Sequence, residues 1–181
     1  MGQDGEKILG ENRRSLLLQW LKESEKPLTG SDLSSRTNVS RQVIVQDISL
    51  LKARNEPIIA TSQGYIMFNT ERENRKYEQI IACKHSPKDT KNELYTIVDH
   101  GGTVKDVTVE HPLYGHLTAS LFVGNRLEAD QFLSKLSMTN ASLLSELTSG
   151  VHLHTIEANS KTQLEAVIQA LKEQGFLLEQ D

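Results

Sequence analysis

Along the first third of the chain, apolar residues recur with the spacing of α-helices. The first such stretch covers residues 6–23, a short second one ends at Arg36 and can be capped by Thr29 or Ser31, and a third begins after Ser40. In the third stretch, residues four and seven positions apart form one apolar stripe: Ile44, Ile48 and Leu51. Each helix therefore has one face to bury, and together the three predict a small helical core.

Two short β-prone segments follow the third helix. They lie within residues 58–67, on either side of the turn residues Ser62, Gln63 and Gly64. Three helices followed by a hairpin are the elements of a winged helix-turn-helix, and the stretch 31–67 resembles winged-helix repressor modules. The resemblance implies that the third helix enters the major groove of DNA.

The start of the third helix carries the residues that would contact DNA. By the resemblance these are Ser40, Arg41, Gln42 and Gln46, because Arg and Gln in the first turns can reach base edges while other residues hold phosphates. The sequence departs from the usual pattern at Val45 and Gln46, where small polar and basic residues often stand. The alternative is a winged helix that only docks another protein.

After residue 76 the pattern changes to alternating strands and helices. It predicts strands at 77–84, 103–110, 117–123 and 150–157, and helices at 88–99, 128–147 with a break near Asn140, and 161–174. The order β-α-β-β-α-β-α predicts an α+β fold, an open-faced sandwich with its helices on one side of the sheet. The charged stretch 70–75 separates the two patterns, so we predict domains at 1–72 and 73–181.

Charge and cysteine content narrow the possible functions. The chain has 181 residues and a net charge of -4, and the acidic excess lies in the second part, so DNA contact requires a local patch. Cys83 is the single cysteine, which excludes an intramolecular disulfide and fits a reducing compartment. Without a long apolar run or a signal-peptide pattern, we expect a cytoplasmic protein with no membrane contact.

The strand at 150–157 contains His152 and His154. Residues two apart in a strand share a face, so these imidazoles would point to one place and could bind the same metal ion. The alternative is an exposed edge strand with two solvated histidines.

Three motifs occur in order in the second part of the chain. They are Cys83-Lys84-His85 with Glu93 eight residues later, Val109 to Gly115 with the sequence VEHPLYG, and Gly150 to Glu157 with the sequence GVHLHTIE. Together, behind a winged helix, they resemble the three-histidine (3H) domain of niacin-responsive repressors. The resemblance covers residues 77–179.

The resemblance implies a homodimeric repressor of niacin uptake or NAD biosynthesis genes, with operator DNA as its target and nicotinic acid as its co-repressor. It implies a divalent metal, Zn, Ni, Fe or Mn, bound by His85, Glu93, His152 and His154. A solvated helix-surface role is the alternative for Glu93. Because the metal needs neutral imidazoles, its binding should weaken below a pH of about 6.5.

The resemblance also suggests where the effector binds. The resemblance implies that His111 and Tyr114 line its pocket, while the alternative for His111 is a turn histidine whose ring bonds to the backbone. Nicotinic acid could complete the metal site through its ring nitrogen or its carboxylate, or pair with Lys84 or Arg126.

Two other functions fit parts of the pattern. One is a repressor that senses the metal itself, and the other is a metal-dependent hydrolase or isomerase fused to a DNA-binding module. Near the motifs we find no base or nucleophile without another assigned role beyond His111, and the chain has no phosphate-binding Gly-x-x-x-x-Gly-Lys loop. We therefore predict a regulator and not an enzyme.

Overall fold

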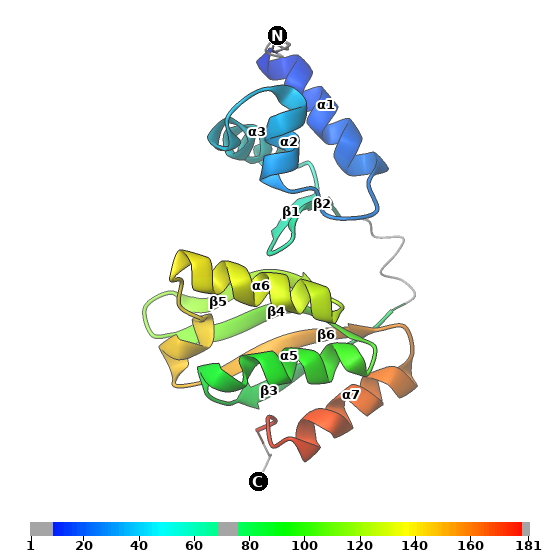
Figure 1. Cartoon of the computed structure of the whole chain (residues 1–181), viewed down its shortest axis with the longest axis vertical. Coiled ribbons are helices and arrows are strands. Elements are labelled where there is room, and N and C mark those ends of the chain that lie inside the picture. Colours follow the sequence, from blue (N-terminus) through cyan, green and yellow to red (C-terminus); the bar gives the residue numbers. More distant parts are fainter. Residues whose placement is uncertain (1–8, 69–75, 179–181) are drawn as a thin grey trace. The chain divides into compact units, whose positions relative to one another are not determined.

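The structure is a computed structural model that describes residues 9–68 and 76–178 (Figure 1). Contacts divide the chain into two compact units, residues 1–70 and 71–181, and each unit has its own hydrophobic core. The predicted boundary between residues 72 and 73 lies outside the described residues. In the part of the chain that the structure describes, no helix combines the length and apolar character that crossing a membrane requires.

The first unit contains the three predicted helices, α1 (Gly10–Glu23), α2 (Gly30–Thr37) and α3 (Arg41–Ala53). Their starts follow from capping: the Thr29 hydroxyl accepts a hydrogen bond from the backbone N–H of Asp32, and the Ser40 hydroxyl does the same for Val43. The beginning of the first predicted helix, at Glu6, lies outside the described residues. The core contains the predicted stripe of α3 and consists of Leu17, Leu21, Leu33, Ile44, Ile48, Leu51 and Ile58.

The predicted hairpin is formed by β1 (Ile58–Thr61) and β2 (Gly64–Met67), which pair antiparallel. Tyr65 also pairs with Leu28 in the α1–α2 connection. Gly64 has a φ of 136°, and a Cβ at this position would lie 2.5 Å from the carbonyl oxygen of Leu28. A glycine is therefore required where the hairpin crosses that segment.

A buried ion pair ties α1 to α3. Nε of Arg13 lies 2.5 Å from Oδ2 of Asp47, and Nη1 of Arg14 lies 3.1 Å from the other carboxylate oxygen. Asp47 is 2% exposed. Loss of Asp47 would remove the carboxylate that both arginines of α1 share, so this ion pair helps to fix the position of α3 in the unit.

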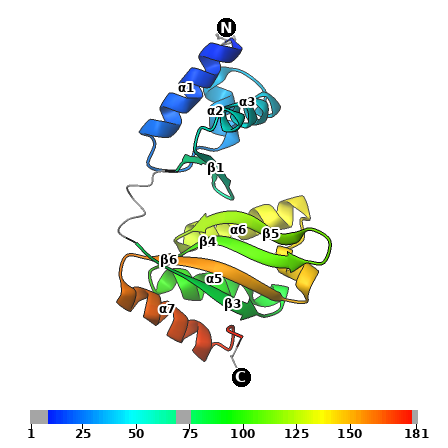
Figure 2. The ribbon, with the colours of Figure 1, turned by 180° about the vertical axis from the view of Figure 1, so that it is seen from behind.

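The second unit is an antiparallel sheet with all its long helices on one face (Figures 1 and 2). The strand order is β3-β6-β4-β5, and the strands are β3 (Tyr77–Lys84), β4 (Gly102–His111), β5 (Gly115–Val123) and β6 (Val151–Ala158). This is the predicted α+β sandwich. Because β6 pairs with β3 on one side and β4 on the other, it is an interior strand and not the edge strand of the alternative interpretation.

The helices that cover the sheet are α5 (Thr90–Asp99), α6 (Arg126–Thr139) and α7 (Lys161–Glu173). Residues 87–89 precede α5 as a 3-10 turn, so the helix predicted from residue 88 begins slightly later. The break predicted near Asn140 is present: Asn140 has left-handed backbone angles, and residues 144–148 form a separate 3-10 helix. The helix α6 therefore ends at the predicted break, and the apolar residues after Asn140 belong to a separate segment.

Candidate metal centre and DNA-binding surface

The four predicted metal ligands meet at the carboxylate of Glu93. Nε2 of His85 lies 2.7 Å from Glu93 Oε2, Nε2 of His152 lies 3.3 Å from Oε1, and Nε2 of His154 lies 3.4 Å from Oε2. Glu93 is 1% exposed, and His152 and His154 are 3% exposed. The solvated alternatives for Glu93 and for the two strand histidines are therefore wrong.

Local structure explains how these side chains converge. Glu93 belongs to the face of α5 that packs on the sheet, because it lies three residues after buried Thr90 and four before buried Ile97. Gly150, with a φ of 92°, lets the start of β6 approach His85: a Cβ there would lie 2.3 Å from the His85 carbonyl oxygen. That close approach brings His85 beside His152, with ring centroids 4.9 Å apart.

Backbone carbonyls orient all three imidazoles in the same way. Nδ1 of His85 lies 2.8 Å from the Ser86 oxygen, Nδ1 of His152 lies 2.9 Å from the Gly150 oxygen, and Nδ1 of His154 lies 2.6 Å from the Asp106 oxygen. A carbonyl only accepts hydrogen bonds, so each Nδ1 carries the proton and donates it. In its neutral form, each ring would then present the lone pair of Nε2 to Glu93, which is the arrangement of metal-binding histidines.

This arrangement requires a positive charge at its centre. Lone pairs of neutral imidazoles and of a carboxylate repel one another at these distances unless a proton or a cation lies between them. Three protonated imidazoles around one carboxylate would leave a buried excess of positive charge, which is costly. A divalent cation shared by the four groups, with the imidazoles neutral, would leave a smaller positive excess.

The distances from Glu93 to the imidazoles, and one unsatisfied nitrogen, also suit a metal, although among the described residues the group whose ligand atoms all lie within 4.8 Å of one another is Cys83, Glu93 and His152. Ligand atoms about 2.1 Å from one ion are separated by roughly 3.0 to 3.4 Å in tetrahedral or octahedral sites, which matches His152 and His154, while the His85 separation is shorter. The close His85 contact lacks hydrogen-bond geometry, so its Nε2 is a buried nitrogen without a hydrogen-bond partner among the described residues. A transition metal would satisfy it.

Electrostatics couple the imidazoles to the carboxylate. Burial alone would raise the pKa of the Glu93 carboxyl, but the three imidazoles outweigh it and hold this pKa well below its usual range. Burial alone would lower the pKa of His85 and of His154, but Glu93 outweighs it and raises both. Without metal, the centre therefore attracts protons to its imidazoles.

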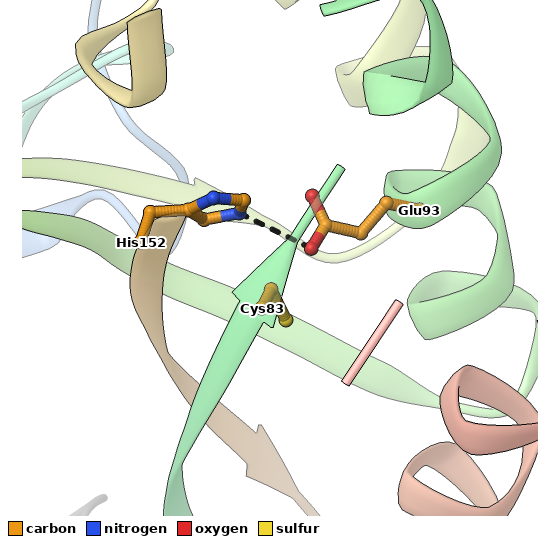
Figure 3. Close-up of side chains that lie close together, drawn as sticks. All are labelled: Cys83, Glu93 and His152. Carbon is orange, nitrogen blue, oxygen red and sulfur yellow. Dashed lines mark hydrogen bonds and ion pairs between the residues drawn. The ribbon is translucent and has the colours of Figure 1, made fainter. Parts of the chain in front are cut away.

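Cys83 lies at the same centre, although we did not predict it as a site residue. It is fully buried on β3, opposite His152 on β6, and the candidate ligand atoms of Cys83, Glu93 and His152 lie within 4.8 Å of one another (Figure 3). Burial, and then the neighbouring Glu93 carboxylate, raise the pKa of the thiol well above its usual value. Without metal, Cys83 is a neutral thiol.

An apolar cavity of about 160 Å³ adjoins the candidate metal centre. One part of its lining is polar and comes from His85, Thr90, Glu93, His152 and His154. The rest is mainly apolar and comes from α5, the β4–β5 pair, α6 and the segment after it, with Leu94, Val107, Leu121, Phe132, Leu136 and Leu143. The cavity is therefore suited to a small ligand with one polar end.

The two predicted effector residues do not line this cavity. His111 ends β4, and its Nδ1 accepts hydrogen bonds from the backbone N–H groups of Leu113 and Tyr114, at 3.2 and 3.3 Å. This is the turn role that we considered as the alternative. Tyr114 is 69% exposed and stacks against the His111 ring. An effector role for this pair stays a prediction and would need a different surface.

The two basic residues considered as partners of nicotinic acid also lie outside the cavity lining. Lys84 is exposed at the end of β3. Arg126 forms a two-pronged ion pair with Asp99, at 2.7 and 2.5 Å, and its guanidinium lies over the ring of Tyr95. Arg126 therefore has a structural partner already.

The predicted DNA-binding residues share the exposed surface at the start of α3. Arg41, Gln42 and Gln46 are exposed, and Ser40 caps the helix. Val45, which departs from the usual pattern, is 45% exposed on the same surface. The buried stripe holds the opposite face, so this surface is free to enter a groove.

Comparisons with known proteins identify both units. A family model described as an HTH domain matches residues 13–66, and one described as a 3H domain matches residues 78–180. The chain is 56% identical over 173 residues to "Transcription repressor NadR" of Bacillus subtilis (strain 168), with 95% of this chain and 96% of the relative covered. It is 36% identical over 174 residues to "Probable transcription repressor NiaR" of Thermotoga maritima, with 96% and 98% covered.

Both relatives are named as transcription repressors and not as enzymes, which agrees with the prediction of a regulator. The resemblance inferred from three short motifs is confirmed over both units. The chain belongs to the family of transcription repressors that join an HTH domain to a 3H domain.

Proposed function

We propose that this protein represses genes for niacin uptake or NAD biosynthesis, with nicotinic acid as co-repressor and a divalent metal in the second unit. The observation that carries the proposal is the convergence of three buried imidazoles on Glu93 beside a small apolar cavity. The exposed start of α3 supplies a surface for DNA, and the names of both relatives support repression.

The size and lining of the cavity support a ligand with one aromatic ring. An engineered protein cavity of about 150 Å³ binds benzene, so a cavity of about 160 Å³ has room for one such ring. Nicotinic acid consists of a six-membered ring with one carboxylate. When bound, the metal supplies positive charge toward which a carboxylate can turn. The apolar side chains then cover the ring and keep water from it.

Regulation requires that the ligand change the arrangement of two DNA-binding units. A homodimer that grips a two-fold operator presents its two α3 helices about 34 Å apart. In our proposal, nicotinic acid binds more tightly to the dimer in that arrangement. For a tenfold gain in operator affinity, the binding free energy of nicotinic acid must differ by about 1.4 kcal/mol between the two arrangements of the dimer.

The test is the affinity for an upstream DNA fragment, measured with and without nicotinic acid and with and without chelator. We expect nicotinic acid to strengthen binding at least tenfold, and chelator to remove that gain. Operator affinity that does not respond to nicotinic acid in the metal-loaded protein contradicts the proposal. If chelator alone weakens operator binding while nicotinic acid has no effect, the protein is a metal-sensing repressor.

A further inference from the structure

Two polar atoms in the cavity lining are buried without a hydrogen bond. Among the described residues that line the cavity, these are Nε2 of His85 and Oγ1 of Thr90. The metal centre accounts for the nitrogen of His85, which faces Glu93. Thr90 is not one of the four ligands, yet it is 7% exposed. A buried hydroxyl without a partner destabilises the fold, so a bound ligand is the natural partner for Thr90.

The position of Thr90 favours an anion. It is the first residue of α5, a ten-residue helix, and it lies one turn before Glu93 on the face that packs on the sheet. The partial positive charge of a helix N-terminus stabilises negative groups nearby. Thr90 lines the same cavity as the predicted metal ligands, so its hydroxyl is available to a carboxylate bound at that end.

The remaining lining fixes the orientation of a ligand. The apolar wall is built by side chains such as Leu94, Leu121 and Phe132, which provide no hydrogen bonds. A carboxylate turned toward this wall would lose its hydration without compensation. A carboxylate is therefore better placed at the polar end of the lining, which includes Thr90, while the ring packs against the apolar wall.

We infer that Thr90 is a ligand-binding residue whose hydroxyl donates a hydrogen bond to the carboxylate of a one-ring aromatic acid in this cavity. The inference rests on the proposed function, which names nicotinic acid as the ligand. It adds the side chain that recognises the carboxylate and the direction in which the ring enters.

Two nearly isosteric variants of the full-length, metal-loaded protein test the inference. Thr90→Val keeps the shape and removes the hydroxyl, while Thr90→Ser keeps the hydroxyl and removes a methyl group. We expect Thr90→Val to weaken nicotinic acid binding about 10- to 100-fold, as for a lost hydrogen bond to a charged group, and Thr90→Ser to stay within about threefold of wild type. Calorimetric titration measures both affinities, and benzoic acid, which lacks the ring nitrogen, should lose the same factor.

The opposite pattern, with Thr90→Val tolerated and Thr90→Ser impaired, shows a packing role and overturns the inference. A loss with Thr90→Val that is confined to nicotinic acid and absent for benzoic acid also overturns it, because the hydroxyl would then bind the ring nitrogen. If wild type binds nicotinic acid and Thr90→Val binds it equally well, the inference fails while the proposed function stands. If wild type does not bind nicotinic acid, both fail.

Discussion

Lowering the pH from about 7.5 to about 5.5 should release metal from the second unit steeply. In our proposal a metal binds neutral imidazoles, so each imidazole that is protonated in the metal-free protein must first give up its proton. Glu93 raises the pKa of His85 and of His154 in spite of their burial. Below these raised pKa values at least two protons compete with the metal, and each reduces the apparent affinity about tenfold per pH unit.

The apparent affinity should therefore fall by about a hundredfold per pH unit, which corresponds to about 2.7 kcal/mol. Calorimetric titration with Zn²⁺ or Ni²⁺ in buffers of different ionisation enthalpy measures both the slope and the number of protons released. The matched control is His116→Gln, since His116 is exposed on β5, and it should leave the slope unchanged. A slope of less than tenfold per pH unit would refute the assignment of His85 and His154 as ligands.

Three further results follow from the two units. Asp47→Asn removes the buried carboxylate that Arg13 and Arg14 share, and it should destabilise the first unit by about 3 to 5 kcal/mol in urea unfolding. Glu11→Gln changes an exposed carboxylate and should leave the unfolding midpoint nearly unchanged, so equal midpoints for the two variants would contradict this. Arg41→Ala should weaken operator binding by about 1 to 3 kcal/mol in gel-shift titrations, because it removes a predicted base contact. Lys172→Ala, at an exposed position of α7, is the control and should leave operator binding unchanged. Equal effects of the two substitutions would exclude a base contact by Arg41. With chelator present, the raised pKa values of His85 and His154 stabilise the fold below a pH of about 6.5, and this stabilisation is lost as the pH rises through the raised values. The lowered pKa of Glu93 stabilises the fold above a pH of about 4.5. Thermal unfolding should therefore show the largest stabilisation by these residues between the two pH values, and a stabilisation that increases above a pH of about 6.5 would contradict this.

The positions of most elements could be predicted because they depend on local patterns. The α3 stripe needs only the helical period, and the shared face of His152 and His154 needs only the alternation of a strand. Whether that strand lies at an edge could not be predicted this way. Its neighbours, β3 and β4, come from distant segments, and pairing between distant segments leaves no local signal.

The burial of Glu93 had a signal in the spacing of α5, because Glu93 shares the helix face of Thr90 and Ile97. A carboxylate is rarely buried unless it is paired, so its charge favoured an exposed position for Glu93. The three histidines that pair with it come from other segments of the chain, and the helical spacing does not show them. Cys83 reaches the centre through its register with His152, which the sequence does not specify. The role of His111 in its turn needed the actual hydrogen bonds to the backbone.

The most direct test compares the response of wild type and Glu93→Gln to nicotinic acid. Both proteins are titrated with operator DNA in the presence of metal, first without and then with saturating nicotinic acid. Glu93 is the group that every imidazole of the centre contacts, so its neutral replacement should abolish the gain in operator affinity that wild type shows. A gain in Glu93→Gln as large as that in wild type would contradict the link between this centre and the DNA-binding unit.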